Sequence, residues 1–139
     1  MSEVIPAAEP SSGGRIDDGM SEALGALRAH QPERAVRALQ GVLSLSAGAG
    51  SLPHAAVLIR LSQARLAQAR GAACPVEAAA RAAQAHGLAH DALRRLRRAG
   101  GSGSTLEVRA ARVRGEAALL LQAIASAAEP SGAGCSLGA

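Results

Sequence analysis

The sequence contains no Phe, Tyr or Trp, no Lys and no Asn among its 139 residues. Aromatic side chains bring the largest buried areas to most protein cores, so any core here is built from Ala, Leu, Val and Ile. Without Lys, Tyr and Asn, most of the usual combinations of general acid, base and oxyanion donor cannot be assembled, and an enzyme is not expected. All 15 basic residues are Arg; with 11 acidic residues, the formal charge is +4.

Strand-forming residues and long apolar runs are also scarce. The chain has seven Val, four Ile and one Thr, against 35 Ala, 17 Leu and 15 Arg, which are strong helix formers. The longest uncharged run, residues 38–59, is interrupted by three Gly and a Pro, so no membrane partner is expected. The composition therefore predicts an all-α domain, and no motif for a cofactor is present.

Five segments carry apolar residues at helical spacing. They are predicted to run over about residues 18–30, 32–46, 53–70, 75–99 and 104–128. The expected architecture is therefore an all-α arrangement of about five helices in antiparallel hairpins, either a repeat array or a small helical bundle. Outside it, residues 1–17 and 129–139 are expected to be disordered tails, which leaves one helical domain over residues 18–128.

Local signals support the helix boundaries and assign each helix a packing role. Pro32 suits the first turn of a helix, and Ser104 with Glu107 three residues later forms a capping box. In the first helix, Leu24 and Leu27 form the apolar stripe. The third helix is apolar on two sides and is expected to be central. The fourth carries a heptad-like seam of Ala, which lets neighbouring helices approach closely.

Two stretches of the chain, residues 21–40 and 62–84, can be laid over each other with one insertion of three residues. The repeated hairpin resembles tetratricopeptide-like (TPR-like) helical repeats over roughly residues 18–128, although the aromatic positions of that family are empty here. The order RALQ…P…RLSQARL…EAAARAAQ is similar to the tetratricopeptide subunit of the cohesin loader. The resemblance implies a non-catalytic scaffold or adaptor, or a fragment of a larger repeat protein, that presents a concave groove to a peptide.

The resemblance places a partner in the groove between the first helices of the repeats. Polar residues off the apolar seams are the candidates to contact it. They are Arg60, Gln63, Arg65, Arg109 and Arg112. Because a guanidinium makes paired contacts with a carboxylate, an acidic protein or peptide segment is the expected partner.

A second candidate surface is a cluster of arginines around the turn between the last two helices. Its members are Arg94, Arg95, Arg97, Arg98, Arg109, Arg112 and Arg114. With Glu107 as the only acid, seven Arg less one Glu give residues 94–114 a charge of +6. Such a patch could bind a phosphate backbone, although no aromatic is present to stack bases. A third interpretation is self-association, in which the Ala seams pack against another copy.

The histidines and cysteines give no expected metal site. His86 and His90 are four residues apart, a spacing that can place two ligands on one zinc ion. Too few further ligands lie nearby, so two solvated histidines are expected. Cys74 and Cys135 do not make a disulfide framework. Reduced thiols are expected, in a protein located inside the cell, either in the cytoplasm or in a eukaryotic nucleus.

Overall fold

The computed structural model describes residues 12–48, 50–100 and 104–128. Within these ranges the secondary structure is helical and includes no strand, which confirms the predicted all-α fold. The helices are α1 (Ser12–Arg28), α2 (Pro32–Ala47), α3 (Ser51–Gly71), α4 (Pro75–Arg98) and α5 (Thr105–Ala128). Four of them start within two residues of the predicted position.

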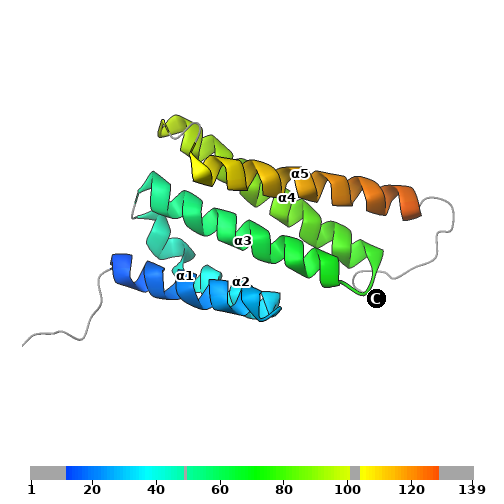
Figure 1. The fold of residues 1–139 in the computed structure, drawn as a ribbon, viewed down its shortest axis with the longest axis horizontal. Helices are drawn as coiled ribbons and strands as arrows, with labels where there is room; N and C mark the ends of the chain where they lie inside the picture. The colour runs from blue at the N-terminus through cyan, green and yellow to red at the C-terminus, as the bar shows by residue number, and fades with distance from the viewer. Residues whose placement is uncertain (1–11, 49, 101–103, 129–139) are drawn as a thin grey trace, which may run out of the picture.

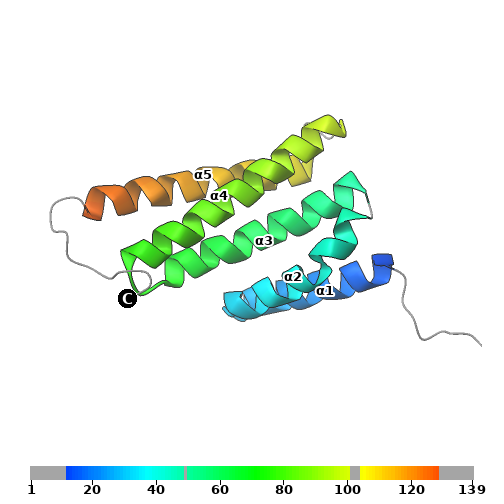
Figure 2. The ribbon, with the colours of Figure 1, turned by 180° about the vertical axis from the view of Figure 1, so that it is seen from behind.

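Helix α3 lies at the centre of the molecule. Figures 1 and 2 show the α1–α2 hairpin on one side of it and the α4–α5 hairpin on the other. It contacts all four of the other helices. The prediction that the helix with two apolar sides is central is therefore confirmed.

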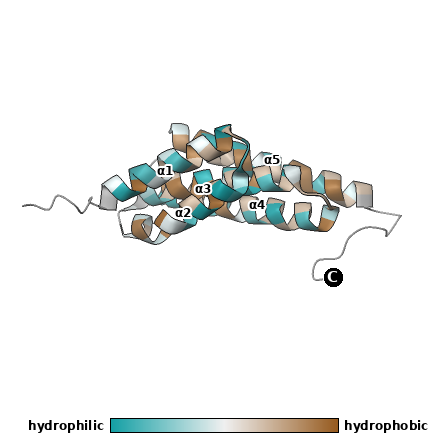
Figure 3. Cartoon of the chain, turned by 90° about the horizontal axis from the view of Figure 1, so that it is seen from below, coloured by the Kyte–Doolittle hydropathy of each residue, from teal (hydrophilic) through white to brown (hydrophobic). Residues whose placement is uncertain are grey.

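The helices alternate between two layers. Helices α1 and α3 approach each other closely, and so do α3 and α5, whereas the backbones of α2 and α4 stay apart within the described residues. Leu43 of α2 and Leu88 of α4 nevertheless pack against the same core cluster. Seen from below in Figure 3, α1 and α5 lie towards one side of α3, and α2 and α4 lie towards the other. One surface of the molecule is thus shared by the three odd-numbered helices.

The core follows the apolar faces that the sequence predicts. The buried residues of α3 are Ala55, Val57, Leu58, Ile59, Leu61, Ser62, Ala64, Leu66 and Ala69, together with His54. One side of α3 packs with α1 and α2, and the other packs with α4 and α5. The seam of α4 is buried along its length, at Ala78, Ala82, Ala85, Ala89, Ala92 and Leu96. Small seam residues let the helices pack closely, as expected.

Helix α1 begins earlier than the sequence predicts. It starts at Ser12, and Ile16 is buried in the core. The expectation of a disordered tail is therefore wrong for residues 12–17. The Ser-Gly-Gly start is a weak helix former, and one isolated Ile carries no periodic signal. The tails predicted at residues 1–11 and 129–139 lie outside the described residues.

The contact between α1 and α2 depends on a glycine. A Cβ built at Gly19 would overlap the Cγ1 atom of Val42. The predicted stripe of Leu24 and Leu27 is only half-buried, whereas Ala23 on the same helix is fully buried. The smallest side chains of α1 thus face α2, and the leucines lie at the edge of this contact.

Candidate functional site

Arginines from three different helices gather on the surface that α1, α3 and α5 share. We define the three-helix face by Arg28 of α1, Arg60 and Gln63 of α3, and Arg109 and Arg112 of α5. The guanidinium of Arg60 is half-buried and donates a hydrogen bond of 2.9 Å to Oε1 of Gln63. Of the five predicted groove residues, Arg60 and Gln63 are therefore in contact, and Arg109 lies close enough for its charge to act on Arg60. Arg112 follows Arg109 by three residues on the same helix.

The pKa of Arg60 is affected by arginines on the neighbouring helices. Burial, followed by the charges of Arg109 and Arg28, lowers the pKa of Arg60. Arginine nevertheless stays charged in proteins, so this position is a cation in an unfavourable environment. Within the described residues, Arg28, Arg109 and Arg112 make no hydrogen bond or ion pair. An anion bound at the three-helix face would relieve the repulsion among these cations.

Arg65 lies elsewhere, although the sequence groups it with Arg60. Five helical positions separate the two side chains, and this turns them about 140° apart around α3. Arg65 donates a hydrogen bond of 3.0 Å to Gln68. Burial and the charge of Arg81 on α4 lower its pKa. Arg65 therefore faces the α4 side of α3 and is not part of the three-helix face.

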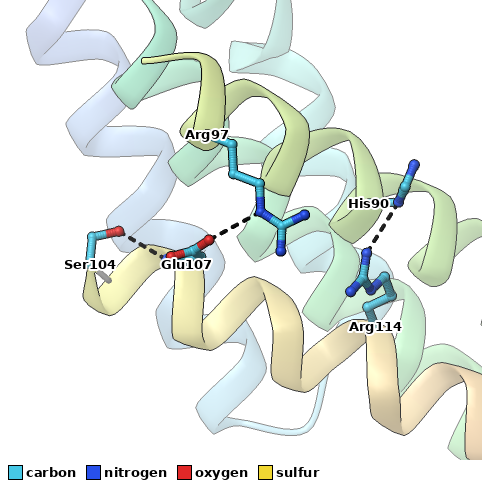
Figure 4. Close-up of polar contacts among 5 residues, drawn as sticks. All are labelled: His90, Arg97, Ser104, Glu107 and Arg114. Carbon is cyan, nitrogen blue, oxygen red and sulfur yellow. Dashed lines mark hydrogen bonds and ion pairs between the residues drawn. The ribbon is translucent and has the colours of Figure 1, made fainter. Parts of the chain in front are cut away.

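The turn between α4 and α5 is tied by polar contacts, drawn in Figure 4. The backbone N–H of Glu107 donates a hydrogen bond of 3.1 Å to Oγ of Ser104, which confirms the predicted N-cap. Nε of Arg97 lies 3.2 Å from Oε2 of Glu107. Arg114 donates to Nδ1 of His90 over 3.3 Å. Two arginines of the predicted cluster therefore link α4 to α5.

Arg94 and Arg98 lie one turn apart on the same side of α4, because consecutive helical residues are turned by about 100°. Arg95 is turned away from both of them. Arg95 pairs with Asp91 at 3.3 Å, and its charge reaches the buried His54. Arg94 and Arg98 are exposed and have no partner within the described part of the chain. The seven-arginine cluster is therefore divided among several surfaces, and Arg109 and Arg112 belong to the three-helix face.

A buried serine–histidine pair was not anticipated from the sequence. Oγ of Ser46 lies 2.8 Å from Nδ1 of His54 and also donates to the carbonyl of Leu43 at 2.8 Å. Ser46 has no exposed surface, so no acyl substrate reaches its oxygen. Burial, then Arg95, lowers the pKa of His54, whereas Asp91 raises it. The pair ties α2 to α3 and lacks the access that a nucleophile requires.

The state of Cys74 differs from the reduced thiol that the sequence predicts. Cys74 is disulfide-bonded, so the prediction of a reduced thiol is wrong for this residue; the only other cysteine, Cys135, lies outside the described residues. A disulfide sulfur is not the thiolate that binds zinc. No group of three His, Cys, Asp or Glu side chains within the described ranges could hold a metal ion. Because disulfides are typical of oxidising compartments, the thiols no longer support a location inside the cell.

No protein-family model matches the chain, and no curated protein or solved structure matches it. Among the described helices, none is long and apolar enough to cross a membrane.

Proposed function

We propose that this protein is a non-catalytic interaction module that binds an acidic segment of a partner protein on its three-helix face. The observation that carries the proposal is that the charges of Arg28 and Arg109 both act on the half-buried Arg60. No carboxylate of the described residues pairs with any of the three. Arginine forks bind carboxylates with two parallel hydrogen bonds. A chain of acidic side chains laid across α1, α3 and α5 would meet one guanidinium on each helix.

The arrangement of the helices supports a repeat array as the framework of this module. The backbone of α3 approaches those of α1 and α5 closely, whereas the backbones of α2 and α4 stay apart in the described part of the chain. A TPR-like array has this alternation, because the first helices of successive repeats share one surface. We therefore propose that the module is a TPR-like scaffold or adaptor and that the three-helix face is its ligand surface.

Binding to a labelled acidic peptide tests the proposal. The probe is a twelve-residue peptide of Glu and Ser, and its affinity is measured by fluorescence anisotropy at two salt concentrations. Replacing Arg28, Arg60 and Arg109 together by Gln should weaken binding roughly thirtyfold, since three pairs at about 0.7 kcal/mol each are lost. The salt dependence should also become flatter.

The matched control removes the same charge from another surface. Arg37, Arg94 and Arg98 are exposed and likewise have no partner within the described residues. Their joint replacement by Gln should weaken binding no more than about threefold, through net charge alone. Equal losses in the two triple variants would show that the peptide responds to overall charge, and the proposed face would be wrong.

Self-association is a second candidate function, favoured by α5. Val108 and Leu119 are 58% and 67% exposed, and eleven positions place them about three turns apart on one side of the helix. Apolar side chains left open on an outermost helix are a surface for another copy. Light scattering over a range of concentrations tests this, with Leu119→Gln as the variant. A wild-type protein that stays monomeric at every concentration would exclude it.

A further inference from the structure

A pocket lies beside the three-helix face. It has a volume of about 350 Å³ and opens between the C-terminal ends of α1 and α3. Its lining residues are Leu27, His30, Pro32, Ala67, Arg70 and Gly71. Ala67 and Arg70 follow Gln63 by one and two helical turns, so the pocket continues the surface that Arg60 and Gln63 begin. None of its lining residues is fully buried, and the pocket is open to solvent.

The lining combines an apolar floor with basic groups. Leu27, Pro32 and Ala67 supply carbon atoms, whereas the side chains of His30 and Arg70 supply hydrogen-bond donors. No acidic residue from the described part of the chain lines the pocket. Arg70 is held by Glu116 at 3.3 Å in an ion pair that is itself exposed. An exposed pair of this kind contributes little free energy, so Arg70 can exchange Glu116 for an incoming carboxylate.

The backbone holds His30 at the pocket in an uncommon conformation. Its φ of 60° lies in the left-handed region, which glycine usually occupies at the end of a helix. The N–H of His30 donates to the carbonyl of Leu27 at 3.1 Å, and the N–H of Gln31 donates to the carbonyl of Ala26 at 2.8 Å. These bonds end α1 and hold the imidazole of His30 at the pocket wall. A glycine at this position would place no side chain there.

We propose that this pocket receives one aliphatic side chain of the acidic segment that binds the three-helix face. The inference rests on the proposed function and makes the ligand more specific: an acidic segment with a single Leu-sized anchor. The volume is at the small end of the range for ligand pockets, and it is large enough to hold a leucine side chain. The basic residues beside the apolar floor match a carboxylate next to that anchor.

Two peptides that differ at one residue test the proposal. Both are twelve-residue peptides of Glu and Ser with a fluorescent label, and one carries a central Leu in place of Ser. The Leu peptide should bind the wild-type protein about tenfold more tightly, because partial burial of a leucine contributes about 1.4 kcal/mol. Ala67→Leu fills the pocket and should abolish this preference without weakening the Ser peptide.

The matched control is Ala56→Leu, which adds the same atoms to the same side of α3, about three turns before the pocket. Ala56 and Ala67 are both half-buried, and Ala56→Leu should keep the tenfold preference. Backbone amide chemical shifts of the wild-type protein give a second measurement, which needs no variant. The Leu peptide should shift Gly71 and His30 more than the Ser peptide does.

The outcomes separate the pocket from the face that it adjoins. If the two peptides bind wild-type protein equally and shift Gly71 equally, the pocket proposal is overturned, while the acidic-segment proposal stands. If Ala56→Leu removes the preference as fully as Ala67→Leu, the anchor lies elsewhere. If neither peptide binds, both proposals fail.

Discussion

The arginines at the end of α4 and those of the three-helix face differ in what surrounds them. Near the end of α4, Arg95 pairs with Asp91 and Arg97 pairs with Glu107, although these arginines are close together in the sequence. On the three-helix face, the charges of Arg28 and Arg109 act on Arg60, and no carboxylate of the described residues pairs with any of the three. Of the arginines at the end of α4, Arg94 and Arg98 remain exposed and without a partner among the described residues. A run of like charges in a helical sequence therefore overstates the unpaired charge of the surface.

The physical reason is the geometry of the helix. Neighbouring residues are turned by about 100°, so a run of arginines is spread around the helix axis. Acidic residues on the next helix, or one turn away, then neutralise the cations that face them. Arginines three or four residues apart, or on parallel helices in one layer, point the same way. The unpaired cations accumulate there.

The largest expected effect comes from separating α1 from its neighbours, because α1 carries one arginine of the three-helix face. In Gly19→Ala, the new Cβ meets Val42, whose β-branched side chain is stiff. Overpacking of this kind costs about 1–3 kcal/mol of unfolding free energy, measured by urea denaturation. Gly25→Ala on the same helix meets nothing within 4 Å and should stabilise the protein by up to about 1 kcal/mol. A destabilised Gly25→Ala protein would contradict this account.

The next largest effect is expected from a substitution that gives Arg60 of the three-helix face a carboxylate partner. Gln63→Glu places a carboxylate where Oε1 of Gln63 now accepts a bond from Arg60. The affinity for the acidic peptide should fall about tenfold, because the new carboxylate competes with the ligand for the same guanidinium. Gln68→Glu, three residues after Arg65 in the same geometry, should change the affinity less than twofold. Anisotropy titrations measure both affinities. Equal losses in the two variants would show that Arg60 is no more important for peptide binding than Arg65.

A smaller effect concerns Arg95, whose charge acts on the buried His54. Burial and Arg95 lower the pKa of His54 from its ordinary value of 6.5, so the unfolded chain binds a proton more readily than the folded protein. Stability should therefore fall as the pH drops below about 6.5. Arg95→Gln removes the repulsion and should reduce that fall.

Urea midpoints at about pH 7.5 and about pH 5.5 would measure the dependence on His54. The control is His54→Gln, which keeps a polar side chain at this position but cannot titrate. It should be less sensitive to this change of pH than the wild-type protein. If the wild-type midpoint rises on acidification by more than that of His54→Gln, the sign assigned to His54 is wrong.

The smallest effect is expected at the α4–α5 turn. Glu107→Gln leaves Arg97 without its ion pair, at a cost within about 1 kcal/mol because the pair is partly exposed. The freed arginine should raise binding of the acidic peptide by no more than about threefold. Glu33→Gln removes the same charge from the first turn of α2 and serves as the control. A gain in peptide binding that is equal in both variants would reflect net charge and not the loss of pairing.

Much of the core could be predicted because it depends on local spacing. The Ala seam of α4, the two apolar sides of α3 and the Ser104 cap can each be recognised within a few turns of helix. The early start of α1 could not, since the burial of Ile16 depends on packing against residues of α2 and α3. The disulfide at Cys74 also had no local signal.

Composition and periodicity alone established that the chain is helical, that its core is built from small aliphatic residues and that its positive charge is carried by arginine. They could not establish which arginines meet. Arg28, Arg60 and Arg109 come together only because α1, α3 and α5 share a layer, and Arg65 is excluded only because of its direction around α3. Helix formation depends on nearby residues, whereas the composition of a surface depends on how the helices pack against one another.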